Sequence, residues 1–350
     1  MTKMMTRLQA IPGQLLPKNM SEAKAKKYLL KAIIMTLRYI LMISLGVMIL
    51  YPLMRMISVL FTHPRALGLV GAVWVPPRIS FDHLQIAWGI LDPARTLSYT
   101  FVHVSGLVVL STLSAAFAGY AFARLKFRGM GLLFMLVLIT FIIPNEVFTL
   151  PHQIMFRNFD VFGIVERITG EPLNLLGQST VMYLMAGMGM GIAGGLFIYI
   201  FRQFYRGLPK ELEEAAYVDG AGVTRTFLTI VLPMAKPAFF TVGTLSFIWN
   251  YNDTHFPGLF NPTLDNIRMR LQAIHTVSGG RSTISQWVNH IARGRIPITA
   301  YYVWGNYGNA QADAAILTIS TLLSLLPLII LFLIIQRQFV QGVERSGIVG

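Results

Sequence analysis

The sequence predicts an all-α integral membrane protein with six transmembrane helices and a helix–turn–helix in one of the connecting loops. Its 350 residues are 54% hydrophobic and only 13% charged, whereas soluble domains carry about 25% charged residues. Several apolar runs are long enough to cross the roughly 30 Å hydrocarbon core of a bilayer. The net charge of +14 does not indicate a nucleic-acid partner, because the Lys and Arg residues are spread over separate loops.

The apolar runs divide the chain into an arm, a membrane domain and a tail. Residues 1–32 form a basic N-terminal arm, residues 33–335 the membrane domain and residues 336–350 the tail. The first span is too long, and follows too long an arm, for a cleavable signal peptide. Pro144 is expected to end or kink the third span. The six expected spans are 33–59, 98–123, 131–150, 179–201, 237–251 and 314–335.

The distribution of positive charge predicts the orientation of the spans. Six spans place both termini on one side of the membrane. The segments on that side carry 17 Lys and Arg residues, whereas the alternate loops carry 10 although they are longer overall. Because positive charge concentrates in cytoplasmic segments, both termini are expected in the cytoplasm, together with the polar loop 202–235.

That polar loop contains the predicted helix–turn–helix. Pro209 suits the first turn of a helix, and three Glu residues follow at positions that the helix dipole favours. Asp219-Gly220 is expected to end this helix, since Gly readily adopts the left-handed conformation of a C-cap. A second short helix is expected over residues 224–232, where Pro233 prevents simple continuation.

The fourth span carries Gly187, Gly191 and Gly195 at intervals of four residues. On one continuous helix this spacing gives a smooth groove that permits close contact with another helix. Packing within this chain and an interface with another membrane subunit both remain open. Met182 and Met185 in the same span are expected to be packing residues.

Two further segments have open interpretations. Trp249, Asn250, Tyr251 and Asn252 combine aromatic rings with hydrogen-bonding groups, which suits either a sugar in a substrate path or an interfacial aromatic belt. The polar segment 261–312 contains five Arg residues. It is either a solvated surface extension or a docking site for an acidic partner or an anionic solute.

The sequence lacks the motifs of an enzyme. It contains no Cys, no HExxH, no GxSxG and no GxxxxGK[ST] phosphate loop. No catalytic residues, metal site or cofactor are therefore expected in this chain, and a membrane-embedded enzyme is the disfavoured alternative. If nucleotide hydrolysis drives the protein, the nucleotide site belongs to a partner.

One motif in the polar loop resembles a known family. Glu214-Ala-Ala-x-x-Asp219-Gly220-Ala221, followed by Leu232-Pro233, resembles the EAA loop of ABC importer permeases of the carbohydrate-uptake type. That type includes the smaller membrane subunit of the maltose transporter. The resemblance covers about residues 38–258 and 312–350. Other segments that carry it are Phe201-Arg-Gln-Phe204, Ile143-Pro144 and Gln336-Arg337.

The resemblance implies a permease subunit of an ATP-driven importer in the bacterial inner membrane. A second permease subunit would complete the path for a sugar or oligosaccharide, and an extracytoplasmic solute-binding protein would deliver it. Two ATPase subunits would bind ATP and Mg. The residues implied in coupling to the ATPase are Glu214, Ala215, Ala216, Asp219, Gly220, Ala221, Leu232 and Pro233.

The chain departs from the family pattern in two places. The segment 261–312 is longer than the corresponding family loop by roughly thirty residues, and the basic N-terminal arm is extended. Both keep open a second solute class, an acidic or phosphorylated compound. The sequence identifies neither the sugar nor the second permease.

Overall fold

A computed structural model describes residues 22–63, 66, 75–76, 78–279 and 310–347. The beginning of the N-terminal arm and residues 280–309 of the 261–312 segment lie outside the described residues. The described chain is helical apart from loops, turns and two isolated β-bridges. Its helices are α2 (Glu22–Phe61), α3 (Asp82–Leu91), α4 (Pro93–Arg124), α5 (Met130–Ile142), η2 (Asn145–Phe148), α6 (Thr149–Arg157), α7 (Ile164–Thr169), α8 (Thr180–Gly187), α9 (Gly194–Arg206), α10 (Glu211–Val218), α11 (Val223–Thr226), η3 (Phe227–Val231), α12 (Leu232–Met234), α13 (Lys236–Asn252), α14 (His255–Phe260), α15 (Ile267–Gly279) and α18 (Ala310–Gly347).

Three helices of the described chain are long and apolar enough to cross a membrane, in α2, α4 and α18. They coincide with the expected first, second and sixth spans. Two bent helix pairs raise the number of candidate spans to as many as five. In the first pair the chain turns by 100° between residues 142 and 145, so the helix breaks at Pro144 as expected. The second pair joins residues 223–234 to α13 with a bend of 73°.

The fourth expected span is not one continuous helix. Residues 188–193 interrupt it between α8 and α9. The backbone is left-handed at Gly189, with φ of +74°, and at Ala193, with φ of +54°, and such residues cannot continue a right-handed helix. The sequence prediction of a continuous helix is therefore wrong here.

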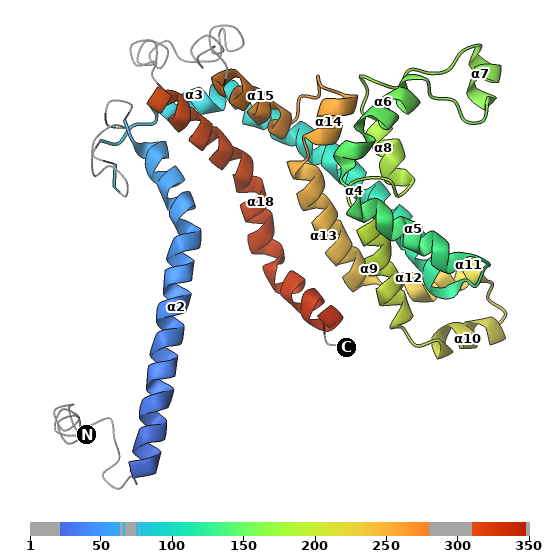
Figure 1. The fold of residues 1–350 in the computed structure, drawn as a ribbon, viewed down its shortest axis with the longest axis horizontal. Coiled ribbons are helices and arrows are strands. Elements are labelled where there is room, and N and C mark those ends of the chain that lie inside the picture. The colour runs from blue at the N-terminus through green and yellow to red at the C-terminus, as the bar shows by residue number, and fades with distance from the viewer. Residues whose placement is uncertain (1–21, 64–65, 67–74, 77, 280–309, 348–350) are drawn as a thin grey trace.

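The helices form a bundle from which α2 stands apart (Figure 1). α4 packs most extensively against α9, α13 and α8, while α18 lies beside α3, α2 and α15. Figure 1 places α10, the N-terminal end of α2 and the C-terminal end of α18 at one end of the molecule, and α3, α15, α14 and α7 at the other. The described ends of the chain therefore lie toward the same end of the molecule as α10.

The junction between α3 and α4 turns at a single residue. Asp92 is left-handed, with φ of +46°, and serves as both the C-cap of α3 and the N-cap of α4. Pro93 then occupies the first turn of α4, where a missing N–H is tolerated. The start of α3 is attached to the end of α2 by His83, whose Nδ1 lies 3.1 Å from the carbonyl oxygen of Thr62. Burial lowers the pKa of His83, which favours a neutral ring that donates to this carbonyl.

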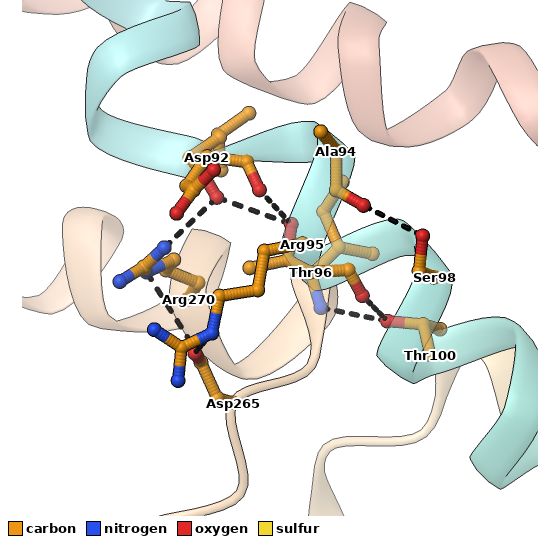
Figure 2. A network of polar contacts seen from close by, with 10 residues as sticks. Asp92, Ala94, Arg95, Thr96, Ser98, Thr100, Asp265 and Arg270 are labelled. Carbon is orange, nitrogen blue, oxygen red and sulfur yellow. Dashed lines mark hydrogen bonds and ion pairs between the residues drawn. The ribbon is translucent and has the colours of Figure 1, made fainter.

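The first part of the 261–312 segment belongs to the core and is no solvated extension. Leu264, Ile267, Leu271 and Ile274 are buried, and α15 packs against α18, α4 and α3. Figure 2 shows Arg95 and Arg270 converging on Asp265, with Nε to carboxylate distances of 3.3 Å and 3.5 Å. These contacts fix the beginning of the segment to the first turns of α4.

A buried hydrogen bond strengthens this attachment and gives a testable prediction. The Ile267 N–H donates to Oγ1 of Thr100 at 3.0 Å, and both residues are buried. Thr100→Val keeps the shape of the side chain but leaves this N–H without an acceptor, so the free energy of unfolding is expected to fall by about 1 to 3 kcal/mol. Thermal denaturation in detergent measures the loss. Thr100→Ser retains the hydroxyl and serves as control, and an equal loss in both variants would contradict the role of the hydrogen bond.

Candidate functional site

The polar loop folds as the predicted helix–turn–helix. α10 ends in a Schellman motif, in which Gly220 N–H donates to Tyr217 O at 3.1 Å and Ala221 N–H donates to Ala216 O at 2.9 Å. Gly220 has φ of +81°, which is the left-handed conformation that this motif requires. Asp219-Gly220 thus ends the helix as expected. Pro209 lies one residue before the N-cap Lys210 rather than in the first turn.

The second helical segment continues beyond the expected stop. α11, η3 and α12 run without a gap to Met234, two residues past Leu232. η3 is π-helical, and the Leu232 N–H donates to Phe227 O. Pro233 lies in the first turn of α12, where it needs no N–H partner. The chain turns at Ala235 before α13 begins, so the interruption comes after Pro233 rather than at it.

α10 has a buried face and an exposed face. Glu213 and Ala216 are buried against the rest of the chain. Leu212, Tyr217 and Val218 are exposed, Val218 at 88%. Glu214 and Asp219 are also exposed, so an acidic rim lies beside apolar side chains. An exposed group of apolar side chains with a polar rim is typical of a protein-binding surface.

A buried ion pair attaches α10 to the end of α4. Arg124 Nε lies 2.6 Å from Glu213 Oε1, and the two side chains are only 8% and 9% exposed. Tyr120 donates its hydroxyl to Glu213 Oε2 at 3.2 Å, and Arg124 donates to the carbonyl oxygen of Leu208 at 2.7 Å. The carboxylate and the guanidinium therefore fix both the helix and the turn that leads into it.

Aromatic rings pack around this ion pair. The Tyr120 ring lies 4.5 Å from the Phe227 ring and 5.7 Å from the Tyr205 ring, measured between centroids. Tyr205 comes from the end of α9 and Phe227 from η3. The end of α4, the end of α9 and the helix–turn–helix consequently form one packed unit, in which α10 cannot move alone without breaking buried contacts.

The sequence analysis missed the two central residues of this unit. Glu213 is one of the three Glu residues that the helix dipole favours, and Arg124 was counted only among the 17 Lys and Arg residues on the side of the termini. The one available indication was helical spacing: Tyr120 and Arg124 lie four residues apart and thus on one face of α4. That spacing gives no information about a partner 93 residues away.

The structure distributes the expected coupling residues over both faces of the loop. Glu214, Ala215, Asp219, Gly220 and Pro233 are exposed. Ala216 is buried, while Ala221 and Leu232 are half-buried. The exposed residues are open to a partner, and the others support them from within the chain.

The three glycines at intervals of four do not share one helix face. Gly187 ends α8, Gly191 lies in the interruption and Gly195 lies in α9. A Cβ atom at Gly195 would lie 2.5 Å from the carbonyl oxygen of Val137 in α5, whereas one at Gly187 would meet nothing within 4 Å. The expected groove is therefore wrong, and Gly195 serves close packing within the chain.

Of the four aromatic and amide residues that end α13, one lines a cavity. Trp249 stacks on Phe197 with centroids 5.6 Å apart. Tyr251 is buried and donates to Ser324 O at 2.7 Å, and the Asn252 amide donates to Ile248 O at 2.9 Å within α13. Asn250 lines the cavity.

This cavity lies among α4, α8, α13 and the loop 188–193. It measures about 20 Å³, room for about one water molecule. Its polar side chains are Ser111, Asn250 and Asp253, and Met182 and Met185 contribute apolar walls. Asn250 also donates to Ser246 O at 2.8 Å, and Ser246 Oγ lies 2.8 Å from Ser111 Oγ. The sequence analysis had assigned neither serine.

Among the residues that the structure describes, no group of three or more His, Asp or Glu side chains could hold a metal ion. The chemistry available at the polar loop is that of a docking surface, with apolar contact area, acidic groups and a fixed backbone.

Comparison with known proteins gives consistent matches. Residues 111–345 match the family described as "Binding-protein-dependent transport system inner membrane component". The chain is 28% identical over 348 residues to the maltose/maltodextrin transport system permease protein MalG of Photorhabdus laumondii, covering 95% of this chain and 99% of that protein. It is 29% identical over 245 residues to the arabinooligosaccharides transport system permease protein AraQ of Halalkalibacterium halodurans, covering 70% of each. A bacterial ABC transporter involved in the import of the acidic polysaccharide alginate has a similar fold, with a TM-score of 0.61 at 16% identity, covering 92% of this chain and 100% of that one.

Proposed function

Because the chain belongs to the family of binding-protein-dependent transport system inner membrane components, we propose that it carries a sugar or oligosaccharide across the bacterial inner membrane together with a second permease subunit. The chain is a permease of an ABC importer and not an enzyme. The sugar assignment rests on relatives named for maltodextrins and arabinooligosaccharides. The alternative, an acidic or phosphorylated solute, is supported by the sn-glycerol-3-phosphate transport system permease protein UgpE of Yersinia pestis, to which the chain is 28% identical over 246 residues, covering 70% of this chain and 69% of that protein.

We propose six spans with both termini in the cytoplasm. α8 and α9 together form the fourth span, and the two bent pairs contribute the third and fifth. The basic excess on the side of the termini supports this orientation. The arm 1–32, the permease domain 33–335 and the tail 336–350 retain their expected boundaries.

Two ATPase subunits that bind ATP and Mg are the proposed cytoplasmic partners, and α10 is the proposed coupling helix. The observation that carries this proposal is the buried Arg124–Glu213 pair, which fixes α10 while its other face stays exposed. A rigid helix can transmit a rigid-body movement of its partner to the spans, whereas a mobile loop would absorb it. The proposed contact residues are the exposed members of the motif, Glu214, Ala215, Asp219, Gly220 and Pro233. Ala216, Ala221 and Leu232 support them.

The substrate path and the permease interface are proposed at two places. Asn250, with Ser111 and Asp253, supplies hydrogen-bonding groups beside apolar walls. Because the cavity has room for only about one water molecule, the helices around it must move apart before a sugar can reach these groups. Trp249, Tyr251 and Asn252 support the position of Asn250 from the same helix. Gly187 faces open space, and none of the residues in the most apolar stretch of α2 is buried within this chain. These two surfaces are available to the second permease and to lipid.

Val218→Asp tests the coupling role. A carboxylate on the exposed apolar face would have to be desolvated on docking, so solute-stimulated ATP hydrolysis by the reconstituted complex is expected to fall at least about tenfold. Val218→Leu keeps the apolar contact and is the matched control, and co-purification with the ATPase reports assembly. Unchanged stimulated hydrolysis and unchanged co-purification in Val218→Asp would contradict the proposal.

The solute class needs a separate measurement. Calorimetric titration of the partner binding protein with neutral oligosaccharides and with phosphorylated or acidic sugars is expected to give micromolar or tighter binding only for the neutral compounds. A preference for the charged compounds would establish the alternative and leave the coupling role intact.

A further inference from the structure

Three basic residues follow one face of the N-terminal half of α2. Lys27, Lys31 and Arg38 are all exposed, and steps of four and seven residues return to nearly the same face of a helix that has 3.6 residues per turn. Lys24 has the same register in the sequence, whereas Lys26 does not. We call the face that carries Lys27, Lys31 and Arg38 the basic stripe of α2.

The basic stripe has no partner of opposite charge among the described residues. No ion pair in that part of the chain includes any of its three members. The first 40 residues contain eight Lys and Arg residues and a single acidic residue, Glu22. Figure 1 shows the N-terminal half of α2 apart from the other helices. The described chain therefore supplies no counter-charge for the stripe.

The position of the stripe along α2 coincides with an expected membrane boundary. A helix rises 1.5 Å per residue, so a hydrocarbon core of roughly 30 Å takes up about 20 residues. Counted back from Arg55, an exposed cation near the other end of α2, this length places the boundary of the core near residue 35. Arg38 then lies just inside the boundary and Lys31 just outside it. Their long side chains bring both charges to the level of the lipid headgroups.

The alignment of the charges distinguishes a binding surface from a topology signal. The orientation of a span depends on how many Lys and Arg residues flank it on the cytoplasmic side, whichever way they face. Charges on one face at headgroup level instead concentrate positive potential where anionic phosphates lie. Figure 1 also shows α2 and α10, the proposed contact with the ATPase, on opposite flanks of the molecule. Charge and depth therefore favour a lipid headgroup over an acidic protein surface.

We infer that the basic stripe of α2 binds the headgroups of anionic phospholipids in the cytoplasmic leaflet. This inference rests on the proposed topology, since it requires the N-terminal end of α2 to lie on the cytoplasmic side. It gives the permease a lipid site that is separate from the coupling helix and from the proposed solute path.

The absence of Cys from the chain permits a local measurement. Ile34→Cys places a fluorophore on the stripe between Lys31 and Arg38, and Thr36→Cys places one at nearly the same depth on the opposite face. Both positions are exposed. The complete transporter is reconstituted in phosphatidylcholine nanodiscs that contain either phosphatidylglycerol or phosphatidylcholine with a nitroxide quencher near its headgroup.

The two fluorophores are expected to respond differently. At Ile34→Cys, phosphatidylglycerol should reach half-maximal quenching at about one fifth of the mole fraction that phosphatidylcholine needs, because each Lys or Arg at the surface contributes about a fivefold preference for anionic lipid. At Thr36→Cys the two lipids should quench alike.

Removing the charges of the stripe in the Ile34→Cys protein is expected to abolish the preference for phosphatidylglycerol. This variant combines Lys27→Gln, Lys31→Gln and Arg38→Gln. The matched control removes three exposed charges from other segments that the proposed topology places on the same side of the membrane, and it should keep the preference. It combines Lys126→Gln, Arg128→Gln and Arg206→Gln.

A charge-neutral exchange tests the face of the helix rather than the number of charges. Leu29→Lys with Lys31→Leu keeps the net charge and moves one cation to the opposite face of α2. The preference at Ile34→Cys is expected to fall about fivefold. An unchanged preference would show that net charge alone attracts the lipid.

Two further results would overturn the inference. One is an equal preference for phosphatidylglycerol at Ile34→Cys and Thr36→Cys. The other is the absence of any lipid preference together with loss of ATPase co-purification when the three charges of the stripe are removed, which would assign the stripe to an acidic protein surface. Labelling of Lys26→Cys with a membrane-impermeant maleimide tests the topology separately. Reaction in intact spheroplasts would contradict the proposed topology itself, so the two failures are distinguishable.

Discussion

Arg124→Ala is expected to lower the free energy of unfolding by about 3 to 5 kcal/mol, because it leaves a buried carboxylate without its counter-charge. Arg124 is the cation paired with Glu213, and both side chains are buried. The loss also releases the carbonyl oxygen of Leu208, to which Arg124 donates. Thermal denaturation of the detergent-solubilised complex measures the change in stability.

The same variant is expected to abolish coupled transport even at temperatures where it remains folded. α10 would lose its attachment to α4, so movement of the ATPase would displace α10 without displacing the spans. Solute uptake into proteoliposomes, measured together with ATP hydrolysis, is expected to show hydrolysis without proportionate uptake. Arg128→Ala removes an exposed charge from the same turn and should leave both quantities near their wild-type values.

The double variant Arg124→Leu with Glu213→Leu separates stability from coupling. Removing both charges avoids an unpaired buried ion, so most of the lost stability is expected to return. The directional contacts that fix α10 do not return, and uptake per ATP hydrolysed should stay low. If Arg124→Ala and Arg128→Ala behave alike in denaturation and in uptake, the ion pair is not the attachment of α10.

The local features of the polar loop could be predicted from the sequence, because the information lies within a few residues. Gly220 ends α10 because glycine adopts the left-handed C-cap conformation without a clash. The charged and apolar residues around it determine the other local features of the loop. The partner of Glu213 could not be predicted in this way. Arg124, Lys126 and Arg128 look alike in the basic sequence 124–128, and only tertiary packing buries the side chain of Arg124.

The fourth span shows a different limit. Glycines at intervals of four predicted a continuous helix with a smooth groove on one face, and no proline indicated an interruption. The interruption depends on Ala193 in a left-handed conformation, which no local preference of alanine predicts. The long first, second and sixth spans were predicted correctly, because a run of some twenty apolar residues leaves few alternatives in a bilayer.

The packing of α4 against α9 leads to the second large expected effect, at Gly119. A Cβ atom there would lie 2.6 Å from Phe201 Cβ, 3.0 Å from the Arg202 backbone nitrogen and 3.1 Å from the Ile198 carbonyl oxygen. Two of these atoms belong to the backbone and cannot rotate away. Gly119→Ala is therefore expected to lower the free energy of unfolding by about 1 to 3 kcal/mol, and Gly119→Leu to prevent assembly altogether.

The position of Gly119 extends this effect to coupling. α9 ends at Arg206, and the turn that follows contains Leu208, whose carbonyl oxygen Arg124 binds. A shift of α9 away from α4 would move Leu208 and α10 relative to Arg124, so Gly119→Ala should reduce stimulated ATP hydrolysis as well as the denaturation temperature. Gly243→Ala in α13 is the matched control, because nothing lies within 4 Å of its Cβ position and alanine favours a helix by about 1 kcal/mol over glycine. Equal denaturation temperatures for the two variants would show that α9 yields to the added methyl group, and the close approach of α4 and α9 would then not be what holds the coupling helix in place.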